Sequence, residues 1–164
     1  MNMPWARLWA FVALFSTLQM AYLSLSSGQL ERFVIEQVTV GGTALLLNWL
    51  DPAAGVVAEG ARLSAPGGGL HVRAGCEGTD VALLLGSALL VAHLPWRQRL
   101  LGLAAGLLLV VVLNQLRMLA LFHAYRHHRH AFELLHGTWL PLAMVLVAGA
   151  FYLFWVGRAA PLHR

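Results

Sequence analysis

The sequence predicts an all-α integral membrane protein with about four transmembrane helices. Of its 164 residues, 59% are hydrophobic and only 11% are charged, whereas a soluble domain carries roughly 25% charged residues. The apolar residues also gather in runs of the length that crosses a bilayer. A water-soluble fold of this size could not bury so many apolar side chains, which excludes the soluble globular class. We expect one membrane-embedded domain over residues 1–164.

The N-terminal third is predicted to hold one transmembrane helix and one interfacial helix. We interpret residues 5–25 as a retained transmembrane helix, because only Arg7 supplies positive charge ahead of the run and no small-x-small cleavage site follows it. Residues 28–50 are interrupted by Glu31 and Glu36 and broken in the middle by two glycines. They favour a helix that lies in the membrane interface, with a re-entrant or fifth span as the alternative.

Residues 51–75 are the clearly soluble stretch of the chain and are predicted to form a small external loop. Asp51-Pro52 should end the preceding helix. Short strand candidates at 56–57 and 70–72 flank the turn-forming residues 66–69. This pattern predicts a β-hairpin-like loop just before Cys76.

Three further spans are predicted at residues 79–94, 100–122 and 137–157. The first of them is at the low end of what crosses about 30 Å of hydrocarbon. Residues 95–99 are predicted to form a tight turn with two arginines, and residues 123–136 a polar, basic connection.

Topology is expected to bring the chemically active residues to one face of the membrane. Cys76 lies at the start of the second span, Asn114 and Arg117 in the last third of the third span, and His136 at the start of the fourth. Successive spans alternate in direction, so these three positions share one face whether or not residues 28–50 cross.

Cys76 is the only cysteine, so the chain can form no internal disulfide. It stands between Gly75 and Gly78, directly before an apolar helix that Thr79 or Asp80 could cap. The partial positive charge of a helix N-terminus favours a thiolate, which is the nucleophilic form. The alternative is an inert buried thiol.

Arg117 is costly in an apolar run, by roughly 2.5–3.5 kcal/mol at a helix centre. Asn114, three residues earlier, lies on the same helical face. The pair suggests a fixed guanidinium that stabilises an oxyanion or binds a carboxylate, unless Arg117 snorkels to the head groups. His136 could act as general base and acid, although the sequence does not distinguish it from the other histidines, eight in all.

No metal or cofactor is expected. The basic run at 126–130 has no carboxylate or cysteine at ligand spacing, and we interpret it as a solvated loop that faces anionic head groups or an acidic substrate motif. Haem ligation is disfavoured because only His93 lies inside a predicted span. The net charge of +4 forms no basic stripe on a soluble face, so no nucleic-acid partner is expected.

Three motifs occur in a fixed order: C-x-G at Cys76-Glu77-Gly78, N-x-x-R at residues 114–117, and a histidine that opens the last span at His136-Gly137. This arrangement resembles the exosortase/archaeosortase family, and the chain is similar to its short H or M subtypes. The resemblance covers roughly residues 50–157, and the first 50 residues match little beyond hydropathy.

The resemblance implies a membrane cysteine peptidase or transpeptidase that cleaves C-terminal sorting signals. Its partners would be membrane lipid and exported proteins that end in a short motif, a transmembrane helix and a basic tail. Cys76 would be the nucleophile, Arg117 the stabiliser of the tetrahedral intermediate and His136 the acid/base. Asn114 would orient groups in the site, beside Glu77 and Gly78 of the cysteine motif. The site would face the periplasm from a bacterial inner membrane.

A non-catalytic scaffold is the alternative. In that case Asn114 and Arg117 pair with a partner helix, Cys76 is incidental, and Cys76→Ala is silent. Arginine counts do not settle the orientation, because five would lie on each side of the membrane.

Overall fold

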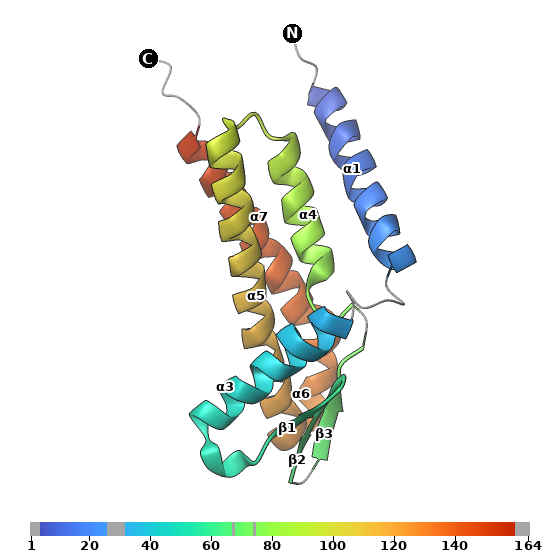
Figure 1. The fold of residues 1–164 in the computed structure, drawn as a ribbon, viewed down its shortest axis with the longest axis vertical. Helices are drawn as coiled ribbons and strands as arrows, with labels where there is room; N and C mark the ends of the chain where they lie inside the picture. The colour runs from blue at the N-terminus through green and yellow to red at the C-terminus, as the bar shows by residue number, and fades with distance from the viewer. Residues whose placement is uncertain (1–3, 26–31, 67, 74, 160–164) are drawn as a thin grey trace.

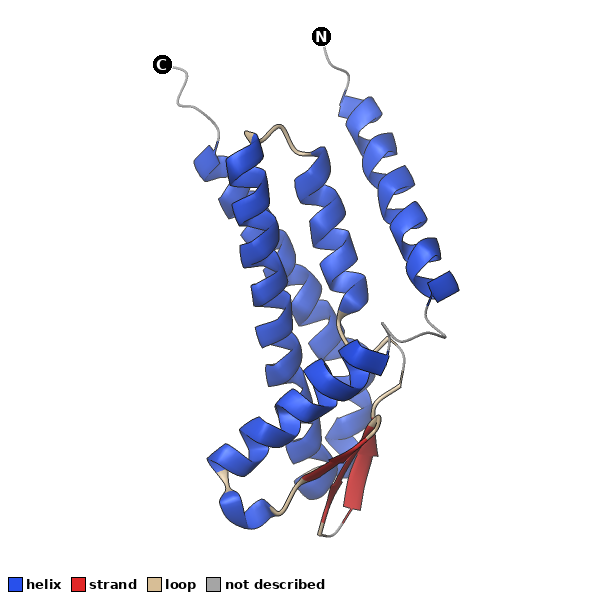
Figure 2. Ribbon diagram, viewed as in Figure 1, coloured by secondary structure: helices blue, strands red, loops and turns tan. Residues whose placement is uncertain are grey.

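The computed structural model describes residues 4–25, 32–66, 68–73 and 75–159, in which helices dominate and one small sheet is present (Figure 2). The elements are, in order, α1 (Pro4–Leu25), the π-helix η1 (Phe33–Gly41), α3 (Gly42–Leu50), the 3₁₀ helix η2 (Pro52–Ala54), β1 (Val57–Glu59), β2 (Arg62–Ala65), β3 (Gly68–His71), α4 (Thr79–Val91), α5 (Trp96–His127), α6 (Arg129–Leu134), the π-helix η3 (Leu135–Trp139) and α7 (Leu140–Ala159).

Helices α4, α5 and α7 pack against one another, and α1 lies on the outer side of α4 (Figure 1). Both ends of the chain lie at one end of this bundle, and the sheet lies at the other. In the described part of the chain, four helical stretches are long and apolar enough to cross a membrane: Trp5–Ser24, Phe33–Leu50, Trp96–His127 and Arg129–Arg158. The predicted class, an all-α membrane protein, is confirmed.

The segment Phe33–Leu50 has the length and hydropathy of a span, yet it crosses the bundle obliquely at the sheet end (Figure 1). The predicted break at Gly41-Gly42 is wrong, because the helix continues there and changes from π to α geometry. Residues 28–31 lie outside the described part.

Gln115 of α5 explains the change of geometry. The Gly42 N–H bonds to the carbonyls of Gln37 and Thr39 and passes over that of Val38. The freed Val38 carbonyl accepts a hydrogen bond from Gln115 Nε2 at 2.7 Å. A Cβ on Gly42 would lie 2.9 Å from the same nitrogen, so a larger residue would require the Gln115 amide to shift.

The external loop contains three strands instead of the two that were predicted. Asp51 ends α3 as expected, but β2 lies between the two predicted strands, so that they do not pair with each other. The sheet is antiparallel in the order β1-β2-β3, with Leu63 opposite Leu70. Gly60, with φ of +56°, supplies the additional tight turn between β1 and β2.

Helix α4 is shorter than the predicted span at 79–94. Its 13 residues rise about 20 Å at 1.5 Å per residue, less than the roughly 30 Å of bilayer hydrocarbon. The predicted turn at 95–99 is also wrong, because α5 begins at Trp96. Arg99 instead reaches back from α5 and donates to the carbonyls of Ala92 and Leu94 at the end of α4.

The predicted polar connection at 123–136 is helical. It contains neither glycine nor proline, so α5 continues to His127, and only the non-helical backbone of His128 separates it from α6. The π-turn η3 then precedes Pro141, which has no N–H to bond the Gly137 carbonyl four residues earlier.

The buried apolar residues form two clusters along α5. One joins the sheet end of α5, including Met118 and Phe122, to η1, α3 and the sheet. The other packs Val110 of α5 against α4 and α7. The buried polar residues Asn114 and Arg117 lie between these positions on α5, so the candidate site occupies the boundary between the two clusters.

Candidate active site

A thiol and an imidazole meet at the sheet end of the bundle. Cys76 lies in the turn between β3 and α4, where its N–H donates to the Arg73 carbonyl at 3.0 Å. Its Sγ is 3.9 Å from Nε2 of His136, which η3 carries. Both side chains are partly buried. The distance is at the long end of a sulfur hydrogen bond, as is common for a nucleophile–base pair without bound substrate.

The orientation of His136 comes from aromatic packing. The ring of Phe132, one helical turn earlier, is stacked on it with centroids 5.5 Å apart and planes at 5°. His136 Nδ1 is buried and has no hydrogen-bond partner among the described residues. In that part of the chain, no carboxylate or amide therefore fills the third position that orients the base in a triad.

Gly78 brings the cysteine turn against α5. Its φ is +80°, in the left-handed region, and a Cβ there would lie 3.3 Å from Asn114 Cγ and from Met144 Cε. The prediction that Thr79 or Asp80 caps α4 is wrong. Gly78 occupies the N-cap position without a side-chain cap, because both of those side chains are engaged by α1.

Helix α1 is tied to the cysteine turn by its polar side chains. Tyr22 Oη donates to Glu77 Oε1 at 2.9 Å and accepts from Thr79 Oγ1 at 3.4 Å, and Gln19 Nε2 donates to Asp80 Oδ1 at 2.7 Å. These contacts were not anticipated. The sequence did contain a signal for them. Gln19 and Tyr22 are three residues apart, so they share one face of an otherwise apolar helix.

Glu77 is buried, and its second carboxylate oxygen has no hydrogen-bond partner in the described part of the chain. Together with Tyr22, Gly78 and Asn114 it lines a cavity of about 400 Å³ between α1, η1, α4 and α5. The motif residue Glu77 is thus directed toward α1, and the Cys76–His136 contact does not involve it.

Arg117 is one turn beyond Asn114 on α5 and is only 6% exposed, which disfavours snorkelling. Among the described residues it forms no ion pair or hydrogen bond, so the structure does not link it directly to Cys76 or His136. It lines a cavity of about 290 Å³ with Leu140 and Met144. Met144 is also adjacent to Gly78, so this one side chain lies next to both the cysteine turn and the Arg117 cavity.

These features define a helical membrane protein with a paired thiol and imidazole, and with a buried arginine that has no counter-charge among the described residues. The family model described as transmembrane exosortase matches residues 2–155. The chain therefore belongs to the transmembrane exosortase family, which is associated in general with membrane protease or transpeptidase activity.

The family match also corrects the extent of the resemblance. It begins at residue 2, so the first 50 residues belong to the family region, in agreement with the contacts of α1 to the cysteine turn. Comparison with curated proteins and with solved structures gave no match.

Proposed function

We propose that this protein is a membrane cysteine transpeptidase or peptidase that cleaves C-terminal sorting signals of exported proteins. The observation that carries the proposal is the contact between Cys76 Sγ and His136 Nε2 at 3.9 Å. It places the only thiol of the chain within reach of a base that can take its proton.

The reaction is an acyl transfer in two steps. His136 Nε2 takes the thiol proton, and the Cys76 thiolate attacks the carbonyl carbon of the scissile peptide bond. The tetrahedral intermediate collapses, the C–N bond breaks, and His136 returns the proton to the leaving amine. An amine acceptor or water then attacks the thioester, gives its proton to His136 and releases the Cys76 sulfur.

Arg117 is proposed to stabilise the oxyanion of the tetrahedral intermediate. Its buried guanidinium has no counter-charge among the described residues, and a fixed cation in a low-dielectric site interacts strongly with developing negative charge. Asn114, which touches the cysteine turn at Gly78, would hold that turn and orient the substrate carbonyl.

The substrates are proposed to end in a short motif, a transmembrane helix and a basic tail, as family membership suggests. The site would face the periplasm from the inner membrane of a bacterium. Arginine positions do not decide this orientation. Of the described residues, Arg7, Arg97, Arg99 and Arg158 lie at the bundle end that holds the termini, and five other arginines lie toward the sheet end.

The test is co-expression with exported proteins of the same genome that carry such C-terminal signals. Wild type and Cys76→Ala are compared by gel shift and by C-terminal mass spectrometry. We expect loss of the tail only with intact Cys76, and a thioester adduct that hydroxylamine releases. Full processing by Cys76→Ala, with equal insertion of both proteins, would refute the proposal and favour the scaffold alternative.

Two further variants test the assisting residues. His136→Ala and Arg117→Lys should each insert normally and reduce processing at least about a hundredfold, because general-base and oxyanion contributions are of that order. Lysine keeps the charge of Arg117 but loses its planar fork. His71→Ala, on the exposed face of β3, is the matched control and should process normally.

A further inference from the structure

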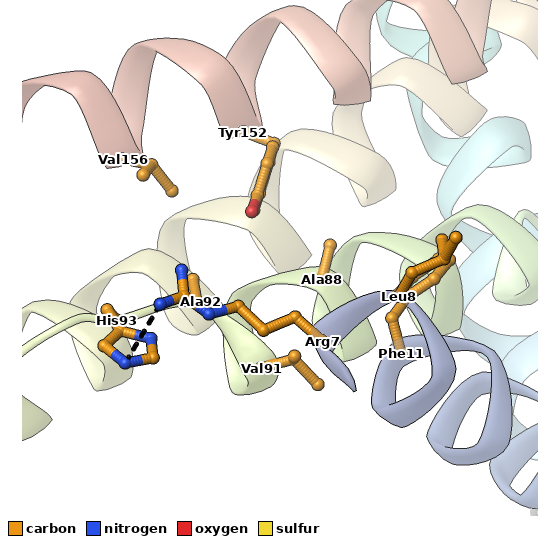
Figure 3. Close-up of a pocket in the computed structure, with 9 residues that line it drawn as sticks. All are labelled: Arg7, Leu8, Phe11, Ala88, Val91, Ala92, His93, Tyr152 and Val156. Atoms are coloured by element: carbon orange, nitrogen blue, oxygen red, sulfur yellow. Dashed lines mark hydrogen bonds between the residues drawn. The ribbon is translucent and has the colours of Figure 1, made fainter. Parts of the chain in front are cut away.

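A second cavity lies at the opposite end of the bundle from Cys76. It has a volume of about 620 Å³ and lies between the first turns of α1 and the last turns of α4 and α7 (Figure 3). Helix α1 packs on α4, and Tyr152 and Val156 of α7 form the far wall. The proposed peptidase chemistry uses none of these residues.

The polar groups of this cavity are basic or neutral. Arg7 extends from α1 toward the end of α4, where its Nη2 is 3.3 Å from His93 Nε2 (Figure 3). The Tyr152 hydroxyl points into the same space from α7. His93 is the one hydrogen-bond partner of Arg7 in the described part of the chain, and no carboxylate there pairs with it. A guanidinium beside an imidazole, without a counter-charge, attracts an anion.

The depth of the polar and apolar groups indicates what kind of anion fits. Arg7 and His93 lie at helix ends, where the membrane surface would be. Phe11 lies one turn deeper along α1, about 6 Å at 1.5 Å per residue, and Ala88 lies deeper along α4. A charged group at the surface therefore continues into an apolar channel, which matches the order of phosphate and acyl chain in a phospholipid.

The surrounding charge favours an anionic head group over a zwitterionic one. Arg97, Arg99 and Arg158 lie at the same end of the bundle, and none of the acidic residues that the structure describes is there. A head group that carries its own ammonium would meet these guanidinium groups unfavourably, whereas a phosphodiester with a neutral head group would be attracted.

We propose that this cavity is a binding site for one anionic glycerophospholipid, with its phosphate on Arg7, His93 and the Tyr152 hydroxyl and an acyl chain along Phe11 and Ala88. The lipid would fill the groove between α1 and α7 and hold α1 against the bundle. Because α1 also carries Tyr22, which bonds Glu77 beside the active cysteine, the bound lipid would support the cysteine turn from the other side of the membrane.

The test is native mass spectrometry of the detergent-purified full chain with added phosphatidylglycerol or phosphatidylcholine of identical acyl chains. The wild-type protein should bind phosphatidylglycerol more tightly than it binds phosphatidylcholine. Arg7→Gln should weaken that binding about tenfold, the usual size of a lost charge-assisted hydrogen bond. Arg97→Gln is the matched control. It removes the same charge at the same end, where the guanidinium lies over the Trp96 ring, and should bind as the wild type does.

A second pair of variants tests the acyl channel without changing charge. Ala88→Phe should fill the cavity and reduce phosphatidylglycerol binding, whereas Ala104→Phe, on the exposed side of α5, should not. Unchanged binding by Arg7→Gln would overturn the site, and so would equal losses in Arg7→Gln and Arg97→Gln. Displacement of the lipid by glycerol 3-phosphate at equal concentration would show that the head group alone is bound, which overturns the lipid assignment.

Discussion

The backbone of Gly78 sets how closely the cysteine turn approaches α5. A φ of +80° is open to glycine, whereas a side chain adopts it only with strain. The space that a Cβ would need is already occupied by Asn114 and Met144 at 3.3 Å. Both the backbone conformation and the packing at position 78 therefore require glycine.

Gly78→Ala should therefore displace the cysteine turn and uncouple Cys76 from His136. We expect the free energy of unfolding to fall by about 1–3 kcal/mol, and processing to be lost to a greater degree than stability. Thermal unfolding in detergent and the co-expression assay measure the two effects. Gly149→Ala, at a helical position with nothing within 4 Å, is the control. It should leave processing unchanged and should not lower the free energy of unfolding, because alanine favours the helix more than glycine does. If Gly78→Ala processed substrate as well as Gly149→Ala does, position 78 would not require glycine.

At the residue scale, the sequence could predict proximity but not orientation. Alternating spans were enough to place Cys76, Asn114 and His136 near one another, because that argument needs only the order of apolar runs. The stacking of Phe132 on His136 and the bond from Tyr22 to Glu77 depend on how helices rotate about their axes. The catalytic roles of the motif residues remain predictions.

At the scale of elements, side chains from α5 decide the form of the oblique helix. Gln115 donates to the Val38 carbonyl and accepts from Thr43 Oγ1 at 2.8 Å. It thereby takes the place of one backbone hydrogen bond of η1–α3. Since η1 also lines the cavity beside Glu77, Gln115 connects α5, which carries Asn114 and Arg117, to the wall of that cavity.

Gln115→Leu should release this connection. The Val38 carbonyl would lose its donor, whereas the Thr43 hydroxyl would keep the Thr39 carbonyl as an acceptor at 2.6 Å. We expect the free energy of unfolding to fall by about 1–3 kcal/mol. Thermal unfolding in detergent measures the change. Gln37→Leu, an exposed glutamine on the same π-helix, is the matched control. If Gln115→Leu and Gln37→Leu both melt at the same temperature as the wild type, the hydrogen bond to Val38 does not stabilise the η1–α3 helix.

The errors in predicted elements have a common physical origin. Residues 123–136 were predicted to be a connection because they are polar, but polarity does not end a helix without glycine, proline or a competing side chain. Gly41-Gly42 was predicted to break a helix, yet the backbone stays helical there, where Gln115 donates a hydrogen bond to the Val38 carbonyl. Hydropathy predicted three of the four span-length helices. It did not predict that Phe33–Leu50 has span length or that Thr79–Val91 falls short of it, because tertiary contacts set the helix boundaries.

At the scale of the whole molecule, charge and function separate along the long axis. The end with the termini carries arginines without acidic partners in the described part of the chain, and the other end carries the sheet, Cys76 and His136. The difference between the two ends comes from the acidic residues, because the sheet end carries five described arginines of its own. Acidic residues contribute little to membrane orientation, so the difference does not settle it. An end that is basic without acidic neighbours is suited to the anionic cytoplasmic leaflet.

The orientation can be tested because the chain has a single cysteine. In a Cys76→Ser background, Glu59→Cys reports on the exposed strand β1 and Pro95→Cys on the exposed turn between α4 and α5. An impermeant maleimide added to intact spheroplasts should label Glu59→Cys alone, and inside-out vesicles should reverse the pattern. Detergent-solubilised membranes, in which both positions must react, control for intrinsic reactivity. The opposite pattern would put Cys76 on the cytoplasmic side, where it could not meet proteins after export, and would overturn the proposed substrate class while leaving the thiol–imidazole pair intact.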